Sequence, residues 1–407
     1  MKKNLMFLLV LLFGLALAGC ATKEGEHSQG VFKDKIYVGN SAGTSGTLAA
    51  IGVPYVAGMQ AYFNMINSKG GVDGRKIEFI HMDDECDPTK GKAALIELVE
   101  DKKVFAIVGH FSTPIVSATL ADLKAYGIPA VYFATGMKSL YMDKASADHK
   151  ALFPVQPTYR AEGKLLISRV VGQYNAKKIG VIYTSDDAGN SYIEGIEEQA
   201  REIGGLELVK QQIPPAAVDV AATVTALKNA NVDVIIVAAM QNTFPNVAKE
   251  LATQGNTKPV FTGYLNAQVV ITQQIKDYIN DKFEIFATNW VILTDPQLNA
   301  DYETWIPKEY IKNSNGNAGW IAAHFFVEGL KRLKGKNVTW ENYIAAMEQA
   351  PIKNPFGGYI DFSDGKRLGT TEFNLEKFAP NDPNTPSGWV VVDQMRSIDD
   401  LLNKNKK

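Results

Sequence analysis

The sequence predicts an α/β protein with two domains, each built on a parallel sheet. Apolar runs of strand length alternate with segments whose apolar residues recur at helical spacing, and this alternation occurs twice along the chain. The two series are separated near Phe153-Pro154-Val155-Gln156-Pro157, where the prolines stiffen the chain. The length of 407 residues exceeds what one ordinary core needs and suits two domains.

The first series begins with a short apolar strand at 36–38. Val56, Met59, Phe63 and Ile66 then follow helical spacing, and the helix ends at Lys69-Gly70-Gly71, where glycine accepts the left-handed cap geometry. The run at 104–109 is apolar throughout, as expected of a strand buried on both faces. These patterns predict strands over 36–38, 77–82, 104–109 and 128–133 and helices over 54–67, 88–101 and 114–126.

The second series repeats the same order after the proline-rich crossing. It predicts strands over 179–184, 206–211, 232–238 and 260–262 and helices over 190–203, 218–230 and 244–254. The last third is less regular, with predicted strands over 285–291, 356–362 and 388–393 and predicted helices over 318–333 and 340–349. Periodicity does not assign these last elements to either domain.

The first twenty residues have the layout of an export signal. Lys2 and Lys3 precede an apolar run from Leu5 to Leu17 that is shorter than the ~20 residues of a membrane span. The run ends in Leu17-Ala18-Gly19-Cys20, which resembles the lipobox of bacterial lipoproteins. This implies that 1–19 is a lipoprotein signal peptide and that Cys20 carries lipid. The polar stretch 20–32 is predicted to be a tether. We expect the protein on the extracytoplasmic face of the cell membrane, facing the periplasm if the host has an outer membrane.

Composition and motifs exclude several classes of function. A net charge of −2 gives no basic footprint for nucleic acid. Cys86 is the single cysteine besides Cys20, so it has no disulfide partner once Cys20 is modified. The acidic stretch around Asp83 lacks the glycine and the twelfth-position glutamate of a calcium loop. Gly-x-Ser-x-Gly, His-Glu-x-x-His and phosphate-loop patterns are also missing, so the sequence predicts no enzyme, no metal and no cofactor.

Several segments together resemble the type I periplasmic binding proteins, specifically the leucine/isoleucine/valine-binding solute receptors of branched-chain amino-acid ABC transporters. The resemblance covers roughly 35–392. The segments that carry it are Ile66-Asn67-Ser68-Lys69-Gly70-Gly71-Val72-Asp73-Gly74, Asp83-Asp84-Glu85-Cys86-Asp87-Pro88, Val108-Gly109-His110 and Asp186-Asp187-Ala188-Gly189.

The resemblance implies two doubly wound, Rossmann-like lobes with a central cleft and a three-segment hinge. Lobe one would comprise 33–156 plus 287–371, and lobe two 157–286 plus 372–407. The hinge would let the lobes close on a ligand. We expect a monomer whose partners are a small-molecule ligand, ABC permease subunits and, through its lipid, the membrane.

The ligand is expected at the carboxyl ends of the strands, beside helix N-termini. Thr113 stands where its hydroxyl and backbone N–H can face an anion, although it could also simply cap its own helix. In the family, the two loops after the third and fourth strands hold the ligand's carboxylate. The matching positions here are Ser112, Thr113, Thr135 and Gly136. We also expect the neighbouring Phe111 and Ala134 to contact the ligand.

The sequence departs from the family where the ligand's ammonium and side chain would lie. Leu265 occupies the position of the glutamate that normally receives the ammonium, and Asp187, Gln241, Asn242 or Asn266 could substitute for it. Ile51 and Ala188 replace aromatic residues, and Met240 is adaptable in shape. Family members also often pair the cysteine equivalent to Cys86 with one at the position of Ser112.

These observations predict a lipid-anchored solute-binding protein of an ABC importer. It would bind a branched-chain-like amino acid or a related small carboxylic acid between two closing lobes. An alternative is a ligand-sensing receptor lipoprotein with the same fold that acts through a signalling partner.

Overall fold

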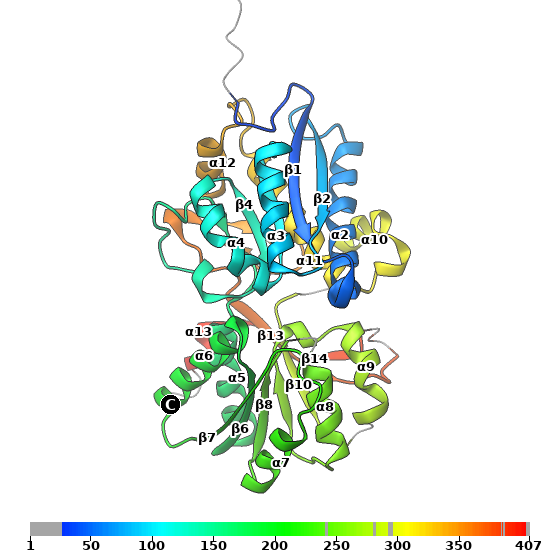
Figure 1. The fold of residues 1–407 in the computed structure, drawn as a ribbon, viewed down its shortest axis with the longest axis vertical. Coiled ribbons are helices and arrows are strands. Elements are labelled where there is room, and N and C mark those ends of the chain that lie inside the picture. Colours follow the sequence, from blue (N-terminus) through cyan, green and yellow to red (C-terminus); the bar gives the residue numbers. More distant parts are fainter. Residues whose placement is uncertain are drawn as a thin grey trace, which may run out of the picture.

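The computed structural model describes residues 27–240, 243–279, 282–291, 296–383, 385 and 387–403. The predicted signal peptide and Cys20 lie outside these residues. The described chain forms two lobes stacked end to end, with β13 (Glu372–Phe378) near their junction (Figure 1). Within the described residues, no helix is both long enough and apolar enough for a membrane span.

Lobe one is built on a parallel sheet in the order β2-β1-β3-β4-β5. Helices cover both faces of this sheet, with α3 and α4 on one face and α2 and α11 on the other. Its described elements are β1 (Lys35–Ala42), β2 (Lys76–Asp83), β3 (Ala106–Phe111), β4 (Ala130–Ala134), β5 (Leu152–Phe153), α2 (Ala49–Ser68), α3 (Pro88–Ile96), the π-helical turn η2 (Glu97–Asp101), α4 (Thr113–Tyr126), α10 (Pro296–Trp305), α11 (Ser314–Lys331), α12 (Trp340–Met347), and the hairpin β11 (Ile352–Lys353) and β12 (Tyr359–Ile360).

Lobe two repeats this winding and adds two antiparallel strands. Its sheet runs β7-β6-β8-β9-β10-β13-β14, and the first five of these strands are parallel. Its described elements are α5 (Tyr159–Tyr174), β6 (Lys178–Thr184), α6 (Asp187–Ile203), β7 (Glu207–Ile213), α7 (Ala221–Ala230), β8 (Val234–Ala238), α8 (Phe244–Thr253), β9 (Val260–Thr262), α9 (Val269–Ile279), β10 (Ile285–Asn289), β13, β14 (Trp389–Ser397) and α13 (Ile398–Asn403).

The predicted α/β class with two doubly wound sheets is confirmed, and several element boundaries are wrong. Helix α2 begins at Ala49 and contains Pro54, which the sequence suggested as its start. Helix α5 and strand β13 were not predicted. The strand expected over 356–362 is reduced to the two residues of β12. Residues 285–289 form one strand of the second sheet, so sheet membership changes after Asn289 and not at 287.

Part of the predicted tether packs on lobe one. Ser28 donates its backbone N–H to the carbonyl of Val338 at 3.1 Å, and the Gln29 amide donates to the carbonyls of Val99 and Val104 at 3.1 and 3.0 Å. Gly30 lies so close to Phe105 that a Cβ there would come within 2.4 Å of its backbone nitrogen. Residues 28–30 therefore belong to the folded body of lobe one, although they precede the predicted boundary at 33.

The loops at the carboxyl edge of the first sheet are braced by side chains from the stretch after β2. Asp83 accepts the backbone N–H of Thr44 at 2.9 Å, and Asp84 accepts the Ser41 hydroxyl and the backbone N–H of Cys86. Burial raises the pKa of the Cys86 thiol to about 12, while the neighbouring Ser112 hydroxyl partly opposes this rise. Cys86 and Ser112 therefore lie side by side, and the thiol stays protonated at neutral pH.

We expect Ser112→Cys to form a disulfide with Cys86, because the two side chains already adjoin each other. The test uses a Cys20→Ser background and counts free thiols before and after mild oxidation, with intact mass as a second measurement. Cys86→Ser in the same background is the control, since it removes the only other described cysteine. Two thiols that persist after oxidation would show that the two loops lie farther apart.

Helices α2 and α11 cross at glycines, which sets the wall of lobe one nearest the other lobe. A Cβ at Gly58 would lie 2.0 Å from the carbonyl oxygen of Gly316, and one at Gly319 would lie 1.9 Å from that of Tyr55. Backbone atoms cannot move aside as a flexible side chain can. The close approach of the two helices therefore requires glycine at these positions.

We expect Gly58→Ala to destabilise the protein by about 1–3 kcal/mol, because overpacking forces the two helices apart. Thermal and urea denaturation should both register the loss. Gln60→Ala, at an exposed position of the same helix, is the matched control and should be nearly neutral. Equal unfolding midpoints for Gly58→Ala and the control would contradict this close crossing.

Candidate functional site

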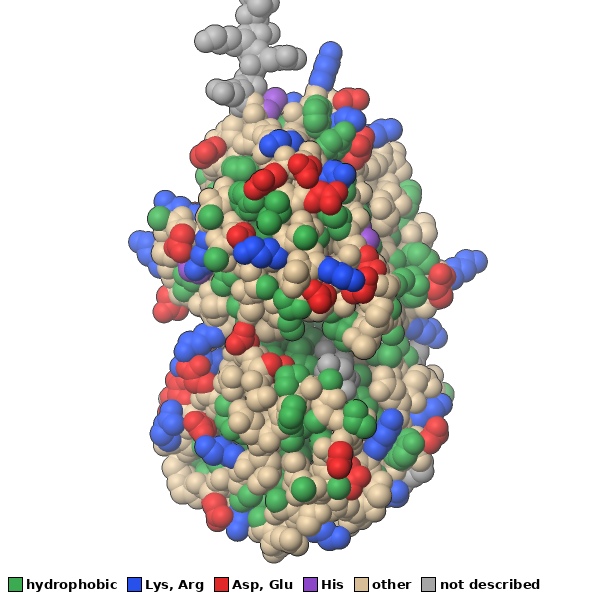
Figure 2. Space-filling model, viewed as in Figure 1, with side chains coloured by type: hydrophobic (Ala, Val, Ile, Leu, Met, Phe, Trp, Pro, Cys, Tyr) green, Lys and Arg blue, Asp and Glu red, His purple; other side chains and the backbone are tan. Residues whose placement is uncertain are grey.

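A cavity of about 150 Å³ lies between the lobes, at the carboxyl ends of both parallel sheets. Figure 2 shows the waist between the lobes, with apolar side chains gathered in the indentation. In doubly wound sheets this edge is where ligands bind. The lining residues are Leu48, Ile51, Tyr55, Phe111, Ser112, Thr113, Pro114, Ala134, Gln156, Asp186, Ala188, Pro215, Met240, Leu265, Asn315 and Ala318.

The polar end of the cavity in lobe one is the N-terminus of α4. Strand β3 ends at Phe111, Ser112 occupies the N-cap with φ +71°, and the helix begins at Thr113. The Ser112 side chain makes no cap bond, and its buried hydroxyl has no well-formed hydrogen bond among the described residues. The first-turn N–H groups of a helix also lack intrahelical partners and carry partial positive charge. This end of the cavity is therefore suited to an anion.

Thr135 and Gly136 support this end from behind without lining the cavity. The hydroxyls of Thr113 and Thr135 lie 2.7 Å apart, and Thr135 also accepts the backbone N–H of Met137 at 3.2 Å. When Thr135 donates to Thr113, the Thr113 proton is free to donate into the cavity. A Cβ at Gly136 would lie 2.5 Å from the carbonyl of Pro157, so the loop passes close to the interlobe crossing.

Lobe two supplies a mainly apolar wall of Ala188, Pro215, Met240 and Leu265, with Asp186 at its edge. Asp186 caps α6, because its Oδ1 accepts the Gly189 backbone N–H at 2.9 Å and the Thr184 hydroxyl at 2.7 Å. Both bonds use Oδ1 and lie within lobe two.

Asp187 and Asn266 do not line the cavity. Asp187 lies outside it and accepts a hydrogen bond from the Ser117 hydroxyl of α4. Asn266 is buried and donates to the Ala239 carbonyl and the Thr262 hydroxyl, both at 2.8 Å. Its amide therefore orders the turn η4 (Tyr264–Asn266). Gln241 and Asn242, the other suggested partners for an ammonium, lie outside the described residues.

The structure thus brings Ile51, Phe111, Ser112, Thr113, Ala134, Ala188, Met240 and Leu265 together and leaves Thr135, Gly136, Asp187 and Asn266 off the wall. Sequence reasoning missed Tyr55, which lies one helical turn after Ile51 and could have been found from that spacing. It also missed Asn315 and Ala318 at the start of α11, from the irregular last third. The Tyr55 hydroxyl is buried and has no hydrogen-bond partner among the described residues.

The lobes touch on both sides of the cavity. On one side, Ser117 donates to Asp187, and Lys138 donates to Glu194 at 2.5 Å. On the other, the Asn315 amide of α11 donates to the Gln268 side chain at 3.1 Å. These contacts join residues of opposite lobes, so the structure represents a closed arrangement.

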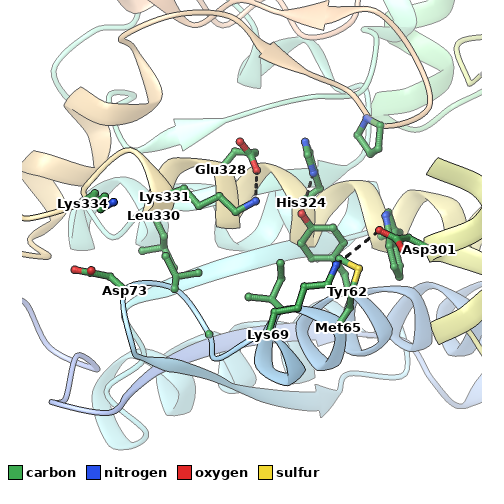
Figure 3. A pocket seen from close by; sticks show the side chains of 15 residues that line it. Tyr62, Met65, Lys69, Asp73, Asp301, His324, Glu328, Leu330, Lys331 and Lys334 are labelled. Atoms are coloured by element: carbon green, nitrogen blue, oxygen red, sulfur yellow. Dashed lines mark hydrogen bonds and ion pairs between the residues drawn. The ribbon is translucent and has the colours of Figure 1, made fainter. Parts of the chain in front are cut away.

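A larger groove of about 690 Å³ lies on lobe one between α2 and α11 (Figure 3). Several of its polar groups pair with one another: Lys331 with Glu328 at 2.7 Å, Lys69 with Asp301 at 3.8 Å, and the Tyr62 hydroxyl with His324 at 3.0 Å. The groove belongs to a single lobe, so lobe closure cannot enclose a ligand there. We therefore place the candidate site in the smaller interlobe cavity.

The described residues contain no group of three or more His, Cys, Asp or Glu side chains suited to a metal ion. His110, next to the cavity loop, is buried, and its Nε2 lies 2.7 Å from the Thr119 hydroxyl. Burial lowers the pKa of His110 to about 4, so the ring is neutral at physiological pH. The arrangement can hold a small anionic molecule with an apolar body.

Comparisons with known proteins agree with this geometry. A family model described as periplasmic binding protein matches residues 35–374. The Leu/Ile/Val-binding protein homolog 2 of Brucella abortus is 23% identical over 330 residues, covering 79% of this chain and 85% of that protein. Both the family description and the name of this relative are those of solute-binding proteins.

Two solved structures share the fold. A fatty acid ABC transporter substrate-binding protein from Thermomonospora curvata superposes with a TM-score of 0.79 at 22% identity, covering 93% of this chain and 96% of that one. A branched-chain amino acid ABC transporter protein from Thermus thermophilus, with bound valine, gives a TM-score of 0.78 at 17% identity, covering 92% and 99%. The chain belongs to the periplasmic binding protein family and has its type I fold.

Proposed function

We propose that this protein is a lipid-anchored substrate-binding protein of an ABC importer that captures a small carboxylic acid with an apolar side chain, either a branched-chain-like amino acid or its deaminated analogue. The observation that carries the proposal is the N-terminus of α4, where the Thr113 backbone N–H and the Ser112 and Thr113 hydroxyls meet an interlobe cavity whose other walls are mainly apolar. A carboxylate fits the amides, and the apolar wall fits a short hydrocarbon chain.

The size of the cavity supports a short ligand. Its volume of about 150 Å³ is well below the roughly 300–1,000 Å³ of sites that enclose drug-sized ligands. The relative from Thermomonospora curvata is named for fatty acids, and the one from Thermus thermophilus contains valine. For this chain we favour the smaller class, because a long acyl chain would not fit between lobes that already touch.

Delivery to a permease and membrane attachment complete the proposal. The two lobes of a monomer would close on the ligand and present it to permease subunits. Attachment through lipid on Cys20 is supported by the Leu-Ala-Gly-Cys sequence that ends the export signal. Metabolic labelling with a radioactive fatty acid tests it, with Cys20→Ser as the unlabelled control.

We expect Thr113→Val to weaken ligand binding about tenfold or more, because a hydrogen bond to a charged group contributes about 1.5–3 kcal/mol. Titration calorimetry with the best ligand of a thermal-shift screen measures the effect. Thr119→Val is the matched control, since it removes a buried hydroxyl from the same helix but one that bonds to His110. Unchanged affinity for Thr113→Val would remove this residue from the site.

Leucine and 4-methyl-2-oxopentanoate should bind with affinities within about tenfold of each other, or 1.4 kcal/mol. The reason is that Leu265 offers no charge, and the Oδ1 of Asp186 is already engaged in capping α6. Calorimetry on both compounds checks this expectation.

Asp186→Asn tests whether Asp186 binds the ammonium group of the ligand. The variant removes the charge but keeps the helix cap, because asparagine caps helices as well as aspartate does. We expect this variant to bind both compounds as the unmodified protein does. A strong preference for leucine that disappears in Asp186→Asn would show instead that Asp186 receives the ammonium.

A further inference from the structure

Glu162 is a buried carboxyl group at the hinge that the proposed binding mode leaves unexplained. It lies in the first turn of α5, directly after the Phe153–Pro157 crossing, and its side chain is fully buried. Its carboxylate accepts hydrogen bonds from the Tyr192 hydroxyl of α6, from the Thr288 hydroxyl of β10 and, at 2.8 Å, from the backbone N–H of Tyr264 in η4. One side chain thus connects three elements of lobe two.

The hydrogen bonds continue from Tyr264 to the ligand cavity. The Tyr264 hydroxyl donates to the side-chain carbonyl of Gln156 at 2.8 Å, and the Gln156 amide donates to the Tyr132 hydroxyl at 2.7 Å. Gln156 lines the cavity, and so does Leu265, the residue after Tyr264. The network therefore links Glu162 in lobe two with Tyr132 on strand β4 of lobe one.

The surroundings of Glu162 contain hydroxyls but no charged partner among the described residues. The groups that face it are Tyr192 from α6, Tyr264 from η4, Thr288 from β10 and Tyr159 on its own helix. Burial raises the pKa of Glu162 to about 7, and its three hydrogen bonds limit the rise. The group is therefore close to half-ionised at neutral pH.

The two protonation states have different hydrogen-bonding needs. The ionised carboxylate accepts all three hydrogen bonds as charge-assisted ones. The protonated acid must donate its own proton, which the Tyr192 hydroxyl can accept, and it holds the Tyr264 N–H and the Thr288 hydroxyl only through weaker neutral bonds. The bond between Tyr264 and Gln156 ties the η4 turn to the crossing between the lobes. Weaker bonds to the Glu162 carboxyl should therefore loosen this turn and the cavity-lining residues that it positions.

We propose that Glu162 is a positioning residue for the ligand cavity. Its ionised carboxylate holds the Tyr264–Asn266 turn, and with it Leu265 and Gln156, in the closed arrangement. Ligand affinity therefore falls when Glu162 is protonated. This inference rests on the proposed function, because it concerns the same cavity. It adds that uptake through this protein weakens in acid.

Glu376 provides a matched control. It is also a buried glutamate, on β13, and it accepts hydrogen bonds from the amides of Asn289 and Asn374 at 3.0 and 3.5 Å. Burial raises its pKa to about 7 as well, but Asn289 and Asn374 do not line the cavity. Because both carboxyls have a pKa above the unfolded value, both favour the folded state at low pH and lose that contribution as the pH rises through about 7. Affinity and stability therefore change in opposite directions, which separates the two effects.

The test measures binding of 4-methyl-2-oxopentanoate to the mature full-length chain in detergent by calorimetry at pH 6, 7 and 8. The carboxyl of this probe stays ionised throughout this range. We expect the unmodified protein to bind about fivefold more weakly at pH 6 than at pH 8. Glu162→Gln should bind weakly at both pH values, because glutamine resembles the protonated acid. Glu376→Gln should keep the pH dependence of the unmodified protein.

Hydrogen exchange of residues 262–268 gives a second measurement that needs no ligand. After correction for the intrinsic rate, protection of the Tyr264 amide should be lower at pH 6 than at pH 8. This difference should disappear in Glu162→Gln and persist in Glu376→Gln. Unchanged protection, or an unchanged pH dependence of affinity in Glu162→Gln, would overturn the inference.

The two measurements distinguish failure of the inference from failure of the proposed function. If the probe does not bind the unmodified protein, the proposed ligand class is wrong, and hydrogen exchange alone decides the role of Glu162 in the turn. If Glu162→Gln does not fold, the pH dependence of exchange in the unmodified protein and in Glu376→Gln decides it.

Discussion

The first turn of α4 is the constraint on which the rest of the binding architecture depends. Pro114 has no N–H and Val116 donates to the Ser112 carbonyl, so the N–H groups of Thr113 and Ile115 are the ones left without a bond inside the helix. Ser112 and Thr113 line a cavity whose other walls are mainly apolar. Unpaired amides in such surroundings are unfavourable unless an acceptor arrives. The braced loops after β1 and β2, the Thr113–Thr135 pair and the narrow crossing at Gly136 all fix the position of this turn.

The hinge adds a second layer to this design. Two buried glutamates hold the chain where it leaves β10 for the crossing between the lobes. Glu162 accepts a hydrogen bond from Thr288, and Glu376 accepts one from Asn289. Both bonds join chain segments that enter or leave the crossings between the lobes. Polar groups that are satisfied in one arrangement favour that arrangement over its alternatives. The hinge can therefore select a defined closed state without contact with the ligand itself.

The sequence was sufficient for the fold class and for the polar end of the site, but not for the remaining walls. Buried parallel strands were located well, because β8 is apolar throughout and β3 is apolar up to His110. Helix α5 was missed because it buries Glu162 and Gly163 beside its leucines, which obscures its periodicity. Asp186 rather than Asp187 lines the cavity because the orientation of neighbouring residues at a helix start depends on cap geometry. Asn315 comes from α11, a helix whose packing only the tertiary structure specifies.

The packing of residues 27–32 on lobe one determines which end of the molecule would be nearer a membrane. Gln29 contacts Val99 and Val104 at the amino edge of the first sheet, opposite the edge that forms the cavity. Residues 20–26 span at most about 25 Å when fully extended. With lipid on Cys20, lobe one would be held close to the bilayer and lobe two would project outward. Opening and closing would then be mainly a swing of the distal lobe, with solute entering from the side, parallel to the membrane surface.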